Sequence, residues 1–165
     1  MSLVKMHVSG LTIDPFTNMP IVILKDESKK IAVPIWIGLI EASAIATEVE
    51  NIELSRPMTH DIIKIMLENL GATVDKIEIA DLMDNTFFSF VFLKHGGKEH
   101  KIDCRPSDAI AIALRTKADI FVDRKVIEKS RKLESIQDTD EKEKSKKWAE
   151  ILENLDADDF GKYKM

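Results

Sequence analysis

The fold is decided by the stretch Ile102-Asp103-Cys104-Arg105-Pro106-Ser107-Asp108-Ala109-Ile110-Ala111-Ile112-Ala113-Leu114-Arg115. It is typical of a strand that turns directly into a buried helix. Pro106 suits the first helical position, where an N–H would have no partner, and Asp108 places a negative charge where the helix dipole favours it. The helix is apolar on nearly every side, so we expect it to be covered all round. Asp103, Arg105 and Asp108 then lie at the polar mouth of an apolar element.

The start of this helix has a counterpart earlier in the chain. Glu41-Ala42-Ser43-Ala44-Ile45-Ala46 and Asp108-Ala109-Ile110-Ala111-Ile112-Ala113 share an acidic residue followed by the pattern Ala-x-Ala-Ile-Ala. Each run follows about three predicted strands and a strand-to-helix turn. Either the chain contains two related strand-strand-strand-helix halves, or two alanine-rich helices resemble each other by chance. In the first case, Glu41 and Asp108 occupy equivalent positions and face a shared cleft.

The remaining hydrophobic patterns predict an α+β fold with mostly antiparallel strands, in two βββα-like halves with packed helices. Further helices are predicted at 39–53, from Thr59 as N-cap to a stop at Gly71, and after Asp123. Pro34 indicates that its strand lies at an edge or carries a bulge. Strands are predicted at 3–8, 21–24, 31–37, 74–82, 87–94, 98–103 and 119–122, and the phenylalanines of the fifth are expected in the core: Phe87, Phe88, Phe90 and Phe92.

The length of 165 residues suits one domain with an appended segment. Residues 1–133 are predicted to form the α+β domain, and residues 134–165 a charged, partly flexible C-terminal tail. Within the tail, a narrow apolar stripe is typical of a short amphipathic helix, formed by Trp148, Ile151, Leu152 and Leu155. This helix either docks on the body or on another chain, or the tail stays disordered.

The charge of the chain argues against a broad, non-specific nucleic-acid surface. The formal net charge is −5, and the deficit lies in residues 1–123, which hold 13 basic and 18 acidic side chains. Such a surface depends on Lys and Arg that neutralise phosphates. A single cysteine, Cys104, and the lack of a signal-peptide pattern or a bilayer-length apolar run predict a cytoplasmic protein without a membrane segment.

Acidic residues recur at predicted helix starts and strand ends, beside a histidine and several arginines. Paired carboxylates can hold a divalent cation that activates water, and an arginine can stabilise the charge that develops in phosphodiester cleavage. The structural alternative is that first-turn carboxylates only stabilise the helix dipole, while the arginines form ion pairs that hold loops. Glu41 and Glu48 share a helix flank but lie roughly 10 Å apart along the axis, so they would not share one metal unaided. The residues alone leave enzyme and binding module open.

Three separated motifs occur in the order Pro34-Ile35-Trp36-Ile37-Gly38 with Glu41-Ala42, then Arg56-Pro57-Met58-Thr59-His60-Asp61, then Asp103-Cys104-Arg105-Pro106-Ser107-Asp108-Ala109-Ile110-Ala111. Together they resemble the bifunctional nuclease domain family, bacterial and plant proteins assigned DNase and RNase activity. The resemblance covers about residues 1–130 and is strongest to the small stand-alone bacterial form. It implies an α+β fold, a homo-oligomer, for which a dimer is the first expectation, and a nuclease that acts on DNA and RNA.

We therefore hypothesise metal-assisted hydrolysis of phosphodiesters in single-stranded DNA or RNA. Candidate substrate ligands are Arg56 and Arg115, and candidate ligands for Mg²⁺ or Mn²⁺ are Glu41, Glu48 and Asp108, with no organic cofactor expected. Motif and local chemistry coincide at the candidate catalytic residues: Glu41, His60, Asp61, Asp103, Arg105 and Asp108. The alternative is a non-catalytic homo-oligomeric module that binds a protein or ligand in the same cleft. A third reading is that Arg56 and Arg105 only lock two helix starts together.

Overall fold

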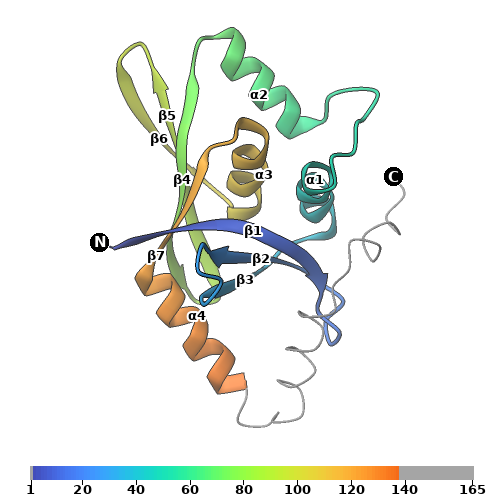
Figure 1. The fold of residues 1–165 in the computed structure, drawn as a ribbon, viewed down its shortest axis with the longest axis vertical. Coiled ribbons are helices and arrows are strands. Elements are labelled where there is room, and N and C mark those ends of the chain that lie inside the picture. The colour runs from blue at the N-terminus through green and yellow to red at the C-terminus, as the bar shows by residue number, and fades with distance from the viewer. Residues whose placement is uncertain (1, 138–165) are drawn as a thin grey trace.

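The computed structural model describes residues 2–137, which form one mixed seven-stranded sheet and four helices (Figure 1). The helices are α1 (Leu39–Val49), α2 (Thr59–Asn69), α3 (Pro106–Thr116) and α4 (Arg124–Gln137). The strands are β1 (Leu3–Ile13), β2 (Pro20–Asp26), β3 (Ala32–Trp36), β4 (Thr73–Met83), β5 (Thr86–His95), β6 (Lys98–Cys104) and β7 (Asp119–Asp123). This is the α+β fold expected from the sequence patterns.

The sheet confirms two βββα halves. Strands β1, β2 and β3 form an antiparallel meander followed by α1, and β4, β5 and β6 form a second meander followed by α3. Strand β7 lies between β1 and β4, and it is antiparallel to β1 and parallel to β4. The first strands of the two halves, β1 and β4, therefore run in opposite directions. Figure 1 shows the first meander crossing the second, with β3 and β6 at the two edges. The edge position predicted for the strand of Pro34 is therefore confirmed.

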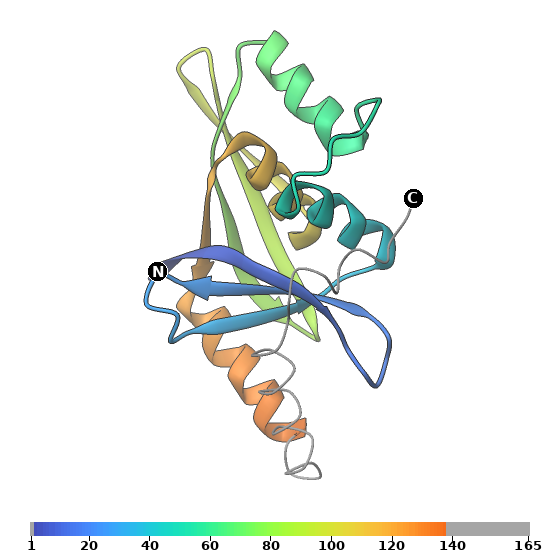
Figure 2. The ribbon, with the colours of Figure 1, turned by 45° about the vertical axis from the view of Figure 1, so that its right-hand side comes forward.

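Helix α3 is the centre of the core. Seven of its residues are buried, among them Ile110, which is fully inaccessible to solvent. Strands β4, β5 and β7 cover one side of α3, while α1 and α2 pack against it from the other side (Figures 1 and 2). The helix that the sequence predicts to be covered all round is thus covered by both halves. None of the helices in residues 2–137 has the length and apolar character needed to cross a bilayer.

Two tight hairpins fix the register of the second meander. Asp84 and Asn85 join β4 to β5 with φ values of 49° and 59°, and Gly96 and Gly97 join β5 to β6 with values of 56° and 73°. Two successive residues with positive φ are characteristic of the turns whose twist matches that of the flanking strands. Gly96 and Gly97 adopt this conformation without a Cβ clash, which explains the hairpin predicted there.

Helix boundaries differ from the sequence prediction at two places. The helix predicted to reach residue 53 ends at Val49, and Asn51 adopts a positive φ of 52° just beyond it. Helix α2 begins one residue earlier than predicted, so Met58 rather than Thr59 is the N-cap. The carboxylate of Asp61, at the third helical position, accepts a hydrogen bond of 2.9 Å from the backbone N–H of Met58, which is the return hydrogen bond of a capping box.

The expected boundary between residues 133 and 134 falls inside a helix, because α4 continues to Gln137. Its start is as predicted, with the Asp123 carboxylate accepting a hydrogen bond of 3.0 Å from the N–H of Lys125. Helix α4 packs against β3, β4 and β7 at the lower end of Figure 1. The amphipathic helix expected around Trp148 lies outside the described residues.

The core prediction for the phenylalanines of β5 is correct only for Phe87, which packs against the buried cluster. Phe88 is exposed, while Phe90 and Phe92 are half-buried on the face opposite Val91. The ammonium group of Lys101 lies 3.8 Å from the centroid of the Phe90 ring, within cation–π range. The run Phe-Phe-Ser-Phe-Val-Phe-Leu is apolar on both faces, so its pattern does not show which face points inward.

Substitution of Ile110 tests the central position of α3. Ile110→Ala is expected to lower the free energy of unfolding by about 2–5 kcal/mol, because the residue is fully buried and the smaller side chain leaves a cavity. Urea denaturation of the purified protein measures this change. The control is Ile40→Ala on α1, where the side chain is 83% exposed. Similar losses for the two variants would contradict the prediction.

Candidate functional site

The strand-to-helix turns of the two halves meet at the side chain of Arg105. This residue is the N-cap of α3, and Glu41 lies in the first turn of α1. The Arg105 guanidinium donates from Nη1 to the Glu41 carboxylate at 2.6 Å and from Nε to the Asp108 carboxylate at 2.8 Å. The predicted convergence of Glu41 and Asp108 therefore occurs, with the guanidinium of Arg105 between them.

Helix α2 adds a histidine to this group. The Nε2 atom of His60, in the first turn of α2, lies 2.9 Å from Oδ1 of Asp108. The side chain of His60 is 14% exposed and that of Asp108 is 26% exposed, whereas that of Arg105 is 64% exposed. We call Glu41, His60, Arg105 and Asp108 the Arg105 cluster. It joins α1, α2 and α3 through four of the six predicted catalytic residues.

Charge pairing keeps both carboxylates of the Arg105 cluster ionised. Burial of Asp108 disfavours its charged form, but hydrogen bonds from Arg105 and His60 outweigh this and hold its pKa below the ordinary value. The pKa of Glu41 is lowered by a hydrogen bond from its own backbone N–H and by Arg105. Hydrogen bonds to Asp108 and Glu41 raise the pKa of Arg105, so the guanidinium remains charged.

A second arginine on α3 is buried and makes a different set of contacts. The Arg115 side chain is 3% exposed, and its Nε donates to the Asp61 carboxylate of α2 at 2.7 Å. Its Nη1 donates to the carbonyl oxygens of Ala44 at 2.8 Å and Ala111 at 3.0 Å. Arg115 was expected to be a substrate ligand, but these donors of its side chain are directed into the protein. Arg115 ties α3 to α1 and α2 instead.

The contacts of Asp61 and Glu48 place them with Arg115. Glu48 lies 3.9 Å from Arg115 Nε, on the flank of α1 that faces α3. Burial disfavours the ionised form of Asp61, but the Met58 N–H and Arg115 outweigh it and lower its pKa. Asp61, predicted to be catalytic, thus neutralises a buried guanidinium. Glu48 is not brought into the Arg105 cluster as the predicted metal set required.

Asp103 and Arg56 lie outside both groups. Asp103 is exposed on β6, and strand alternation directs it to the face opposite Cys104. Arg56 is exposed in the loop that joins α1 to α2. In residues 2–137, no hydrogen bond or ion pair connects either side chain to the Arg105 cluster. Asp103 is therefore not part of the cluster, although it is close to Arg105 in the sequence.

The described residues contain no set of three His, Cys, Asp or Glu side chains positioned to hold a metal ion. Within the Arg105 cluster, the guanidinium occupies the space between the Glu41 and Asp108 carboxylates. The two carboxylates remain as possible ligands for a metal ion. Two carboxylates suit a cation that also binds substrate phosphate and water, and they suit a cation held by protein alone less well.

An open pocket of about 260 Å³ adjoins the cluster, and the sequence did not indicate that residues of the β4–β5 turn would line it. It lies where the end of β3 and the start of α1 meet the β4–β5 turn and the start of α3. Its lining includes Trp36, Asn85, Phe87 and Arg105. In the sequence, only Trp36, on a strand with an edge signal, could have indicated a pocket here. Asn85 could not, because it reaches the pocket only when the two halves pair.

A family model described as the bifunctional nuclease domain matches residues 22–135. The chain belongs to this family. An uncharacterized protein from Mycobacterium tuberculosis strain H37Rv is 32% identical over 162 residues, which cover 94% of this chain and 97% of the relative. Bifunctional nuclease 1 from Oryza sativa subsp. japonica is 28% identical, and bifunctional nuclease 1 from Arabidopsis thaliana is 27% identical. These matches cover 68% and 64% of this chain, but only 35% and 34% of the plant proteins.

Removal of the Asp61 charge tests whether this carboxylate stabilises the fold by neutralising the buried Arg115. Asp61→Asn is expected to lower the free energy of unfolding at pH 7 by about 2 kcal/mol, because hydrogen bonds between charged groups contribute ~1.5–3 kcal/mol. The pKa of Asp61 is lowered in the folded state, so its stabilisation is complete above the unfolded pKa of about 3.9. It is lost as the pH falls through the folded pKa.

The difference between wild type and Asp61→Asn should therefore shrink below about pH 4 in urea titrations. Asp75→Asn serves as the matched control, because it breaks a pair with the exposed Lys94 on the sheet. An equal loss of stability in both variants, or a difference independent of pH, would contradict the role given to Asp61.

Proposed function

We propose that this protein hydrolyses phosphodiester bonds of single-stranded DNA or RNA at the Arg105 cluster. The observation that carries the proposal is the unbroken chain of contacts from His60 through Asp108 and Arg105 to Glu41. It brings a base, an orienting carboxylate and an exposed guanidinium to one surface. Family membership and the names of the plant relatives support this reaction class. We place the protein in the cytoplasm, where an unpaired cysteine such as Cys104 is ordinary.

His60 is the proposed general base. The Asp108 carboxylate is ionised and therefore accepts a hydrogen bond from Nε2–H of His60, which leaves the lone pair on Nδ1. In this tautomer, Nδ1 can accept a proton from an attacking water molecule, while Asp108 orients the ring and stabilises the imidazolium that forms. Asp108 thus acts through His60 rather than on the water.

Arg105 is the proposed phosphate ligand. A guanidinium can donate two parallel hydrogen bonds to phosphate oxygens, and this side chain is the most exposed of the cluster. When His60 is neutral, the cluster contains one guanidinium and two carboxylates and is therefore negatively charged. A further positive charge is needed before it can bind a phosphate. Glu41 and Asp108 would hold Mg²⁺ or Mn²⁺, which would supply that charge and act as a Lewis acid toward the phosphodiester. Arg105 would then exchange a carboxylate partner for the phosphate.

Cleavage of single-stranded DNA and RNA oligonucleotides tests the reaction. His60→Gln is expected to reduce the cleavage rate by about 10²–10⁴-fold, the usual contribution of a general base. Asp108→Asn and Glu41→Gln should also reduce the rate, and chelation of divalent cations should abolish cleavage until Mg²⁺ or Mn²⁺ is returned. The matched controls are Asp75→Asn and Glu68→Gln, at carboxylates paired with surface lysines.

Circular dichroism establishes that each variant is folded. Equal rates for wild type and Asp108→Asn would exclude the Arg105 cluster as the active site. If no folded sample cleaves either nucleic acid under any cation condition, the hydrolase proposal fails in favour of the non-catalytic binding module. Cleavage that survives chelation would retain hydrolysis but exclude the divalent cation.

The second candidate function, a homo-oligomeric module, is favoured by the surface of α2. This helix has no buried residue, although its outward face carries Ile62, Ile65 and Met66 at helical spacing, and Leu70 at the C-cap extends this stripe. Their exposed fractions lie between 43% and 66%, which is unusual for an apolar stripe with no partner. At 3.6 residues per turn, the paired Lys64 and Glu68 lie on a different side of the helix from this stripe, so two copies of the apolar face could meet without charge repulsion. We propose that α2 packs against a second copy in a homodimer.

Met66→Glu is expected to convert the proposed dimer to a monomer, because it places a charge in the apolar contact. Light scattering after size-exclusion chromatography measures the molar mass. Met83→Glu, at an exposed methionine at the end of β4, is the matched control. A dimer that persists in Met66→Glu would exclude α2 as the interface, and a monomer on deletion of residues 138–165 alone would assign the contact to that segment.

A further inference from the structure

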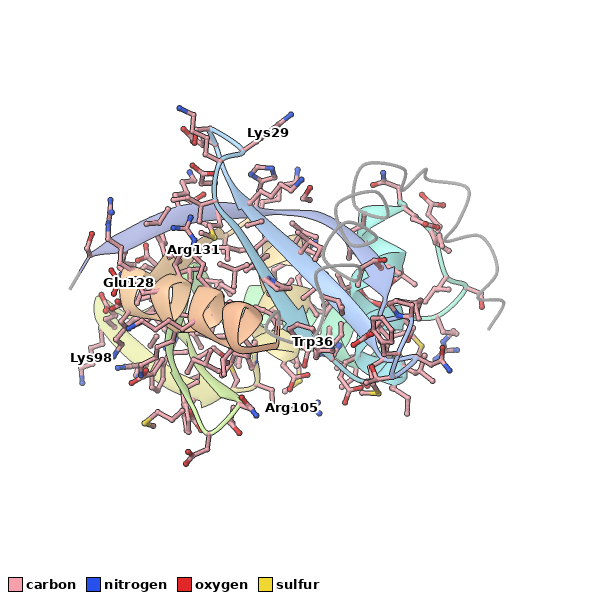
Figure 3. All side chains as sticks on the ribbon, turned by 90° about the horizontal axis from the view of Figure 1, so that it is seen from below. Lys29, Trp36, Lys98, Arg105, Glu128 and Arg131 are labelled. Carbon is pink, nitrogen blue, oxygen red and sulfur yellow. The ribbon has the colours of Figure 1, made fainter. Side chains whose placement is uncertain are left out.

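The pocket beside the Arg105 cluster combines an aromatic ring, an amide side chain and a guanidinium. Trp36 comes from the end of β3, Asn85 from the β4–β5 turn and Arg105 from the start of α3. In Figure 3, Trp36 and Arg105 lie near one another on the side seen from below. These groups come from both halves of the fold, so the pocket exists only in the assembled domain.

The ring of Trp36 is held in place although it is 42% exposed. Its Nε1–H donates to Oδ2 of Asp14 at 3.0 Å. Asp14 is itself buried, and its other oxygen accepts a hydrogen bond of 2.9 Å from the N–H of Phe16. An exposed tryptophan would otherwise lose rotamer freedom when it bound a ligand. The buried carboxylate therefore prepares the indole as a rigid, partly open surface for stacking.

Asn85 contributes a polar residue to the lining of the same pocket. Its backbone is in the left-handed region with φ of 59°, as the second residue of a tight turn, and this fixes where the side chain begins. A primary amide offers both donors and an acceptor, the combination that matches the hydrogen-bonding edge of a nucleobase. Within the described residues, no hydrogen bond of the Asn85 side chain to another residue satisfies this capacity.

The size of the pocket limits its ligand. A volume of about 260 Å³ is below the ~300–1,000 Å³ of pockets for drug-sized ligands. One planar heterocycle is of the appropriate scale, with the remainder of the molecule outside. Arg105 at the rim is placed to bind a phosphate attached to that heterocycle.

We propose that this pocket binds one unpaired nucleobase, stacked on Trp36 and hydrogen-bonded to Asn85, with its phosphate at Arg105. The assignment of this ligand class rests on the proposed function. It adds a reason for preferring single strands, because a base in a duplex is already stacked and paired and cannot enter a pocket without being extruded. Base stacking on aromatic side chains also supplies affinity that the acidic body of this protein does not obtain from charge.

Fluorescence of Trp36 tests the proposal directly. The chain has two tryptophans, so the full-length Trp148→Phe variant leaves Trp36 as the reporter. Nucleoside 5′-monophosphates are the probes, because they carry base and phosphate but no phosphodiester bond that the protein could cleave. These nucleotides are expected to quench the fluorescence of Trp36 saturably. Ribose 5-phosphate, which has the phosphate but no base, is not. Asn85→Ala in the same background should weaken binding of at least one nucleotide severalfold.

Oligonucleotide binding by anisotropy provides the second measurement. Trp36→Ala is expected to weaken single-strand binding by about 5- to 100-fold, the equivalent of one stacked base, while Trp36→Phe should retain most of it. Phe88→Ala, at an exposed ring on β5, is the matched control. Quenching by ribose 5-phosphate equal to that by the nucleotides, or unchanged binding in both Trp36→Ala and Asn85→Ala, would overturn the proposal.

Failure of this proposal and of hydrolysis are distinguishable. Base-dependent quenching without cleavage by any folded sample would exclude the hydrolase and leave the base pocket in place. Cleavage that depends on His60, combined with no base-dependent quenching and an unchanged KM in Asn85→Ala, would retain the hydrolase and exclude the pocket as its base-binding site.

Discussion

Burial of α3 is the constraint on which the rest of the structure depends. A helix with seven buried residues must be covered on all sides, and no single element within residues 2–137 is large enough to do so. The sheet covers one side, and α1 and α2 cover the other. This arrangement brings the first turns of three helices into one region. The Arg105 cluster is therefore a consequence of how the core is closed.

Two arginines near the ends of α3 differ in exposure, and therefore in how readily a ligand could replace their protein partners. Each guanidinium binds a carboxylate from a neighbouring helix, and the two distances are similar. Arg115 is almost completely buried, and its other donors bind two backbone carbonyl oxygens and the hydroxyl oxygen of Thr47, so exchange for a ligand would leave several polar groups unpaired. Arg105 is mostly exposed, and water can replace each of its contacts. Only Arg105 can exchange a protein carboxylate for a phosphate at low cost.

Local patterns were sufficient to predict α3, the two halves, and the meeting of Glu41 with Asp108, because each depends on residues close in sequence or on a repeated pattern. The same patterns could not separate Arg105 from Arg115. That distinction depends on how α1 and α2 pack over the last turn of α3. A helical wheel likewise placed Glu48 on the flank of Glu41, but further along α1 Glu48 faces Arg115 instead of Arg105. The pocket of Trp36 requires a turn that lies 49 positions further along the chain, at Asn85.

The difference between the two halves explains why they form one cluster rather than two. Glu41 and Asp108 occupy the same third helical position, but the N-cap is Gly38 in α1 and Arg105 in α3. A Cβ at position 38 would overlap the Glu41 carboxylate, so the glycine lets that carboxylate fold back over the helix start. The first half thus lacks a cation of its own at this position. One guanidinium serves two carboxylates, and α2, inserted between the halves, brings His60 to the carboxylate that Arg105 already orients.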